Sequence, residues 1–133
     1  MTGEQWVQLW LERALDDMDT AQLLFNNYRP RKLEVSCYQC QQAAEKALKA
    51  YLIFKNHSFK FTHDLLELCV VCATFDTGFH DLEEDCSDIS HYATDARYPN
   101  KNEIDEAETK IALRKAERIV NFCANLIKSP NEK

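Results

Sequence analysis

Apolar side chains recur at every third or fourth position along the first part of the chain, which is the spacing of one face of an α-helix. Thr2 and Gln5 stand three residues apart in front of this stripe, as the two partners of a capping box do at a helix start. The helix must end near Tyr28, because Arg29 precedes Pro30 and a residue before proline avoids the helical conformation. We therefore predict a long amphipathic helix over residues 2–28, with an apolar stripe made of Trp6, Trp10, Ala14, Met18, Ala21, Phe25 and Tyr28.

A second helix is predicted from about Glu34 to Lys55, with apolar residues over more than half of its circumference. A helix that is apolar on two faces usually lies at the centre of a bundle and contacts more than one neighbour. Its alanines allow a partner backbone to come near. We expect the closest packing between Ala43 and Ala50.

Shorter helical segments follow a loop at residues 56–61. Thr62 is the expected N-cap of the next helix, with Asp64 in its first turn near the positive end of the helix dipole. We expect this helix to bury Leu65, Leu68, Cys69 and Cys72, and to end at a left-handed turn at Gly78. A further helix is predicted from about residue 82 to Tyr98 and Pro99, and a last one from near Asn102 to a point before Pro130. Together these segments predict an all-α protein: one domain over residues 1–133, an antiparallel up-and-down four-helix bundle with an additional short helix.

Composition supports this fold class and limits the choice of partners. Two glycines and three prolines in 133 residues leave few turns, which favours long helices. The net charge of −6 argues against generic DNA binding, which needs a basic surface. Residues 28–60 are nevertheless rich in lysine and arginine, whereas residues 76–96 carry seven carboxylates and no lysine or arginine. These segments are either solvated helix faces, complementary surfaces that pair two copies, or a local site for a phosphate.

No apolar run is long enough to span a bilayer, and the first residues lack the features of a secretory signal. We expect a cytoplasmic protein with reduced cysteines. The pairs Cys37/Cys40 and Cys69/Cys72 have the spacing of zinc ligands, but each pair falls within an apolar helical stretch. Because reduced cysteine packs as a small apolar residue, core packing is the preferred interpretation over zinc binding or a redox pair. We expect neither a metal nor a cofactor.

The candidate ligand-binding residues are those that place charge or an aromatic ring at helix ends. Arg97 between Tyr92 and Tyr98 either caps helix-end carbonyls or anchors a phosphate while the tyrosines stack on a base. His63, beside Asp64, is either a capping or surface residue or part of the same site. Lys46 and Lys49 on the second helix are either solvated or face that site.

Taken together, these segments resemble the HEPN domain family of small helical bacterial and archaeal proteins. The resemblance rests on the opening amphipathic helix, CYQCQQAAEKALKA at residues 37–50, THDL at residues 62–65, the Tyr92…Arg97-Tyr98-Pro99 segment and the final helix. It implies a four-helix bundle, commonly a homodimer, often encoded beside or fused to a minimal nucleotidyltransferase, with a proposed role in nucleotide binding. One branch of the family consists of ribonuclease toxins in which a histidine follows an arginine after four to six residues. No arginine of this chain has a histidine at that distance after it.

The expected function is therefore a non-catalytic binding module rather than an enzyme. It would bind a nucleotide, a minimal nucleotidyltransferase, or both, in an accessory or toxin–antitoxin-like role. The alternatives are a ribonuclease toxin with a non-standard site, which would depend on Arg97 or His91, and a purely structural dimerisation domain.

Overall fold

The computed structural model describes residues 1–94 and 103–127. Within them the regular structure is helical, with no strand, which confirms the predicted all-α class. The helices are α1 (Gly3–Tyr28), α2 (Leu33–Phe54), α3 (Leu65–Ala73), η1 (Thr77–Leu82), α4 (Glu83–Ile89), η2 (Ser90–Ala93) and α5 (Glu106–Ile127), where η marks a 3₁₀ helix. None of the described helices is both long enough and apolar enough to cross a membrane.

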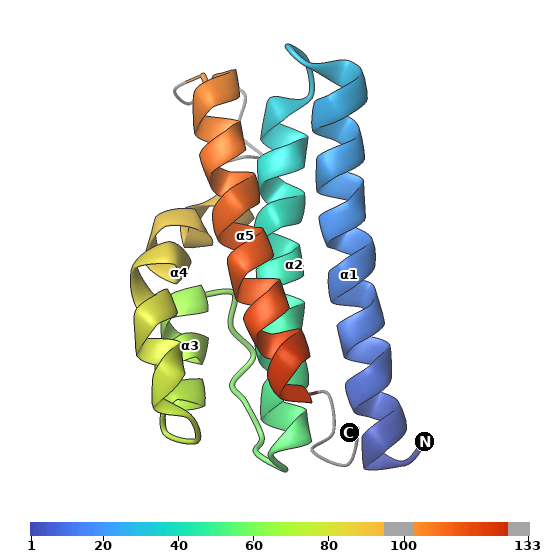
Figure 1. Ribbon diagram of the computed structural model, residues 1–133, viewed down its shortest axis with the longest axis vertical. Coiled ribbons are helices and arrows are strands. Elements are labelled where there is room, and N and C mark those ends of the chain that lie inside the picture. The colour runs from blue at the N-terminus through green and yellow to red at the C-terminus, as the bar shows by residue number, and fades with distance from the viewer. Residues whose placement is uncertain (95–102, 128–133) are drawn as a thin grey trace.

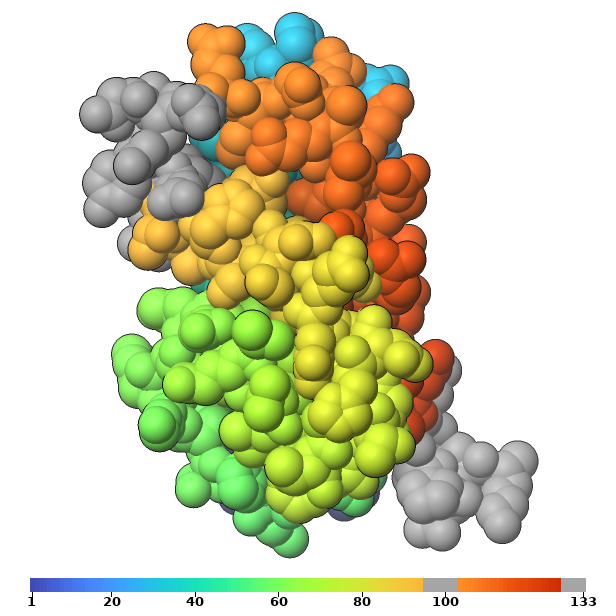
Figure 2. All heavy atoms as spheres, turned by 90° about the vertical axis from the view of Figure 1, so that its left-hand side faces the viewer, coloured from blue at the N-terminus to red at the C-terminus, as the bar shows by residue number. Residues whose placement is uncertain are grey.

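Helix α2 lies at the centre of the bundle, as its two apolar faces predicted. The long helices α1 and α5 run beside it, and α3, α4 and η2 contact it as well (Figure 1). Figure 2 shows the outer surface of this second group, where α3 and α4 form one continuous face. The alanines of α2 between Ala43 and Ala50 are fully buried, as expected where a partner helix packs closely. Nearer the start of α2, Ser36 Oγ donates a buried hydrogen bond of 2.8 Å to the carbonyl of Ala21 on α1.

The capping box and the end of α1 at Tyr28 are confirmed, but the predicted apolar stripe is partly wrong. Trp6 and Tyr28 are exposed, at 45% and 43% of their surface. Because α1 packs mainly against α2 and α5, it buries a narrower line that runs to one side of the tryptophans. The buried residues of α1 are Val7, Leu11, Ala14, Met18, Ala21 and Phe25.

The start of α3 differs from the prediction by two residues. Asp64, not Thr62, is the N-cap, and its carboxylate accepts hydrogen bonds from the amides of Leu66 and Glu67 at 3.0 and 3.2 Å. A carboxylate is favoured here because it faces the positive end of the helix dipole. Thr62 Oγ1 instead accepts from the amide of Asp64 at 3.1 Å, so both side chains shape the entry to α3. The predicted buried residues of α3 are confirmed.

Gly78 does not adopt the predicted left-handed conformation. Helix α3 ends at Ala73, and no described glycine has a positive φ. The glycine lies in η1, where a Cβ atom would come within 2.7 Å of Phe122 Cζ on α5. Close approach of an aromatic ring, rather than backbone conformation, is what requires glycine at this position.

Among the described residues, the lysine and arginine partners of the acidic segment lie on α5 rather than in the basic segment at residues 28–60. Asp85 of α4 forms two hydrogen bonds with the Arg118 guanidinium, at 2.6 and 3.0 Å, and Asp88 pairs with Lys115. Helix α4 continues into η2 as far as Ala93, while the predicted end at Tyr98 and Pro99 lies outside the described residues. Helix α5 begins at Glu106, later than predicted from Asn102, which also lies outside the described residues.

Candidate functional site

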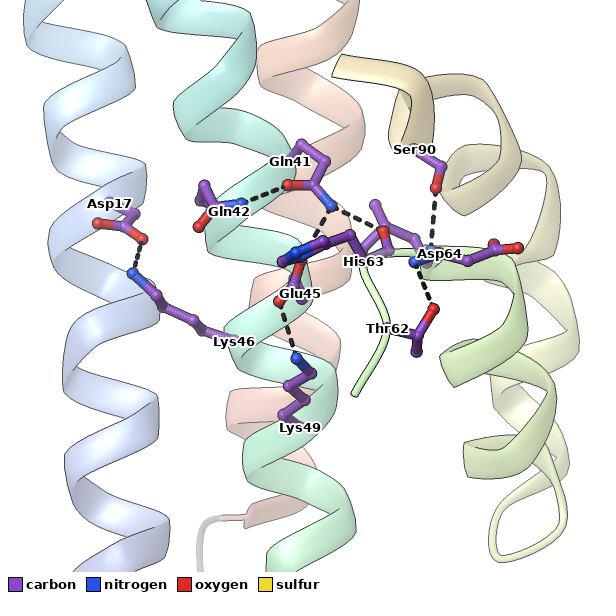
Figure 3. A network of polar contacts seen from close by, with 11 residues as sticks. Asp17, Gln41, Gln42, Glu45, Lys46, Lys49, Thr62, His63, Asp64 and Ser90 are labelled. Atoms are coloured by element: carbon purple, nitrogen blue, oxygen red, sulfur yellow. Dashed lines mark hydrogen bonds and ion pairs between the residues drawn. The ribbon is translucent and has the colours of Figure 1, made fainter. Parts of the chain in front are cut away.

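A polar network on one face of α2 is centred on the carboxylate of Glu45. Its Oε1 accepts from Gln41 Nε2 at 3.1 Å, and its Oε2 accepts from Lys49 Nζ at 2.8 Å. The three side chains lie side by side because residues four apart stack along the same face of a helix (Figure 3). Each of these residues is buried, so α2 carries charged groups at the bottom of a site rather than on its surface.

The network also fixes the end of the loop that connects α2 to α3. His63 Nδ1 lies 2.9 Å from Glu45 Oε1, and Gln41 Nε2 donates to the carbonyl of His63 at 2.9 Å. Gln42 Nε2 in turn donates to Gln41 Oε1 at 2.7 Å and orients the Gln41 amide. His63 is thus held through both its backbone and its ring, yet its side chain is 53% exposed.

The charge state of Glu45 determines which nitrogen of His63 carries the proton. Burial by itself raises the pKa of Glu45, but hydrogen bonds from Lys49, His63 and Gln41 outweigh burial and hold the pKa below its ordinary value. Because an ionised carboxylate can only accept, His63 Nδ1 must be the donor. Among the described residues, Nε2 of His63 is then left without a partner, on a ring that is half open to solvent.

Lys49 and Lys46 occupy two different environments. The ammonium group of Lys49 is buried and lies 5.9, 5.2 and 5.8 Å from the ring centres of Trp10, Phe59 and Phe61. These distances are within the range of cation–π attraction. Lys46 is more exposed and pairs with Asp17 of α1 at 2.6 Å (Figure 3). Both ammonium groups therefore already have anionic partners within the fold.

The loop above this network is basic and aromatic. Residues 55–63 read KNHSFKFTH, with two lysines, two histidines and no carboxylate. Phe61 is 96% exposed, and its ring centre lies 6.4 Å from that of His63 in an edge-on arrangement. Phe59 is partly buried and packs edge-on against Trp10 at 5.9 Å. The loop is thus anchored by Phe59 and His63, and it presents Phe61 to solvent between them.

A family model for the HEPN domain matches residues 7–126, which is most of the chain. The chain belongs to the HEPN domain family. Its structure is similar to that of ST0689, an archaeal HEPN homologue, with a TM-score of 0.73 and 23% identity over 92% of this chain and 98% of that one. It is also similar to TT1696 from Thermus thermophilus, with a TM-score of 0.77 and 25% identity over 90% of this chain and 96% of that one. No curated protein matches the chain.

The HEPN fold brings together four of the predicted site residues, namely Lys46, Lys49, His63 and Asp64 (Figure 3). Asp64 serves as the N-cap of α3, and the other three belong to the network or border it. Sequence reasoning missed Phe59, Lys60 and Phe61. The available signal was the run of basic and aromatic residues without a carboxylate in a loop.

Tyr92 lies apart from this group. It is only 4% exposed, and its hydroxyl donates to Glu108 of α5. Burial and then this hydrogen bond raise the pKa of Tyr92, so the phenol stays protonated. Arg97 and Tyr98 lie outside the described residues. His91, named for a ribonuclease site, is exposed and packs against Tyr92 with ring centres 4.1 Å apart and ring planes tilted by 39°.

The cysteines of this HEPN domain pack in the core, as predicted. All six are free and buried. Burial raises the pKa of Cys37 to about 11, which keeps the thiol protonated, whereas metal binding requires a thiolate. Within residues 1–94 and 103–127 no group of three or more His, Cys, Asp or Glu side chains is placed to hold a metal ion.

Proposed function

We propose that this HEPN domain is a non-catalytic binding module for a nucleotide, which docks on the loop at residues 55–63. One observation carries the proposal: an almost fully exposed Phe61 stands beside a half-exposed His63 on a loop that has cations and no carboxylate. An exposed aromatic ring in a basic environment suits a ligand that is both aromatic and anionic.

Each part of the loop has a distinct role in this proposal. The base stacks on the ring of Phe61, and the phosphates meet Lys60, which directly precedes it and forms no ion pair with the described residues. A protonated His63 donates from Nε2 to a phosphate oxygen while Nδ1 stays on Glu45. Lys46 and Lys49 do not bind the ligand directly, because Asp17 and Glu45 already neutralise them. Their role is to fix the floor on which the loop rests.

The partner in this proposal is a minimal nucleotidyltransferase, in the accessory or toxin–antitoxin-like role that the family resemblance implies, with the module acting as a homodimer. Co-expression with such an enzyme followed by affinity purification and light scattering tests both parts. A stable complex with two copies of this chain supports them, and a lone monomer contradicts them.

Calorimetric titration tests the nucleotide directly, with ATP, UTP, adenosine and inorganic tripolyphosphate as four separate ligands. We expect both triphosphates to bind, and adenosine and tripolyphosphate each to bind at least about tenfold more weakly, because each lacks one of the two contacts. Lys60→Gln should weaken ATP and tripolyphosphate but leave adenosine unchanged. Absence of binding at millimolar ATP contradicts the proposal.

One observation favours a second candidate function, a ribonuclease with a non-standard site. His63 Nδ1 donates to the buried carboxylate of Glu45, which is the arrangement that orients a histidine general base. Its Nε2 is then free to accept a proton. Incubation of the protein with labelled single-stranded RNA separates the two functions. Cleavage that disappears in His63→Asn establishes the ribonuclease, whereas nucleotide binding without cleavage supports the binding module.

A further inference from the structure

A groove opens on the flank of α1 that faces away from the Lys46–Asp17 pair. It lies where the N-terminal half of α1, the end of α2 and the end of α5 meet, at the lower end of the bundle in Figure 1. Leu15 faces this groove, whereas Asp17 faces Lys46 on α2. Two residues along a helix correspond to a rotation of about 200°, so these two side chains leave α1 on nearly opposite sides. Asn56 also lines the groove, so the groove meets the start of the 55–63 loop, but Lys60, Phe61 and His63 do not line it.

Seven of the eleven residues that line the groove are apolar, and Glu4, Gln8 and Asn56 are the polar ones. Its volume is about 550 Å³, and aliphatic or aromatic side chains come from all three helices. They include Leu11, Leu15, Ile53, Phe54, Ala124 and Ile127. Leu15 remains 41% exposed. Covering an exposed leucine that lies beside apolar neighbours with another apolar surface lowers the free energy, so the exposed Leu15 favours binding of such a surface.

The rim on the α1 side is acidic. Glu4 borders the groove, and a shallower hollow that shares Glu4 and Gln8 extends it to Glu12. Along the whole of α1, five carboxylates stand against one cation, Arg13. The segment from Glu4 to Leu15 is about 17 Å long, or about three helical turns. The groove thus combines an apolar floor, a negatively charged rim and the length of a short helix.

We propose that this groove docks an amphipathic helix of a different protein, one with leucine-like residues at helical spacing and lysine or arginine on its flanks. Helix-in-groove recognition uses apolar anchors at positions i, i+3, i+4 and i+7, and the acidic rim selects for basic flanks. A second copy of this chain fits poorly, because pairing α1 with α1 sets two acidic helices against each other. The basic turn of another copy, at Arg29, Arg31 and Lys32, follows the far end of α1, so it would join copies head to tail without closing a dimer.

The test uses a synthetic peptide of about 18 residues with leucines at helical spacing and lysines elsewhere, titrated by fluorescence anisotropy. Two control peptides are needed: one with the same composition in an order that breaks the stripe, and one with glutamates in place of the lysines. In the protein, Leu15→Gln removes an anchor from the groove. Leu23→Gln is the matched control, since Leu23 is 60% exposed on the same helix and does not line the groove.

We expect the striped basic peptide to bind and both control peptides to bind at least about tenfold more weakly. Leu15→Gln should weaken binding by about tenfold and Leu23→Gln by less than about twofold, because one buried leucine corresponds to roughly one power of ten in affinity. Glu4→Gln with Glu12→Gln should reduce the dependence of binding on salt. Circular dichroism establishes that each variant is folded.

Three results overturn the proposal. The first is equal loss of binding in Leu15→Gln and Leu23→Gln, or no binding to the wild type. The second is a dimer in sedimentation experiments that Leu15→Gln dissociates, which would assign the groove to a second copy. The third is a gain of about tenfold in peptide affinity when residues 128–133 are removed, which would assign it to the segment that follows Ile127. None of these results bears on ATP binding through Lys60, Phe61 and His63, because these three residues do not line the groove.

Discussion

The imidazole Nδ1 of His63 lies 2.9 Å from the carboxylate Oε1 of Glu45, and this contact joins the loop before α3 to the central helix α2. Gln41 adds a second tie through the His63 carbonyl. Because both ties end at buried residues of α2, the loop has a defined position although Phe61 and His63 remain open to solvent. The buried Glu45 network of α2 thus holds the exposed 55–63 loop in place.

Lys49→Met should destabilise the protein far more than Lys46→Met. Loss of Lys49 removes an ion-pair partner from Glu45, which is almost fully buried, and should cost about 3 kcal/mol of unfolding free energy. Lys46 and Asp17 form a more exposed pair, whose loss should cost less than about 1 kcal/mol. Urea denaturation followed by circular dichroism measures both changes. Equal costs would show that the Glu45 network does not depend on Lys49.

Glu45→Gln should change how stability depends on pH. The pKa of Glu45 is lower in the folded protein than its ordinary value of 4.5, so its ionised form contributes stability above that pH. This contribution is lost as the pH falls below 4.5 through the folded-state pKa. The variant should therefore be less stable than the wild type at neutral pH and lose less stability on acidification. Glu12→Gln, which removes a carboxylate with no ion pair to the described residues, is the control and should keep the wild-type acid profile. An unchanged profile in Glu45→Gln would contradict the ionised state of Glu45.

Gly78→Ala should destabilise the core by about 1–3 kcal/mol, because the added methyl group overlaps the Phe122 ring. Phe122 stands edge-on to Phe79 with ring centres 4.8 Å apart, so its displacement also disturbs that contact. Gly3→Ala is the matched control, since a methyl group there meets nothing within 4 Å. Thermal unfolding of both variants, and of Gly78→Ala combined with Phe122→Leu, measures the effect. Partial rescue by the smaller side chain is expected, and a neutral Gly78→Ala would refute the steric account.

Local patterns were sufficient to predict the main helices and the buried cysteines. The alanines of α2 and the capping box at Thr2 act over a few residues, and the structure confirms both. Contacts between distant segments were not predictable in this way. Gly78 is required by Phe122 of α5, which is more than forty residues later in the chain. Trp6 is exposed because neighbouring helices cover only part of the apolar side of α1.

In the candidate site, too, local features could be predicted and contacts between distant segments could not. Lys49 and His63 were identifiable by residue type and position, but their common partner Glu45 was not, because helical periodicity does not show which loop returns to α2. Phe61 is recognisable only once its exposure is known, since phenylalanine is usually buried. Tyr92 was predicted to stack on a base because of its aromatic ring, but the ring lies in the core.

Titration of ATP into Phe61→Ala tests the central claim most directly, with wild type and Leu23→Ala measured in parallel. Stacking of a base on an aromatic ring contributes about 1–3 kcal/mol, so Phe61→Ala should bind ATP at least about fivefold more weakly. Its affinity for inorganic tripolyphosphate should stay unchanged, and its unfolding free energy should fall by no more than about 1 kcal/mol, because Phe61 is 96% exposed and the substitution removes its cation–π contact with Lys49 and its edge-on contact with His63. Leu23→Ala should bind ATP as the wild type does. If Phe61→Ala binds ATP with wild-type affinity, the 55–63 loop is not the nucleotide site.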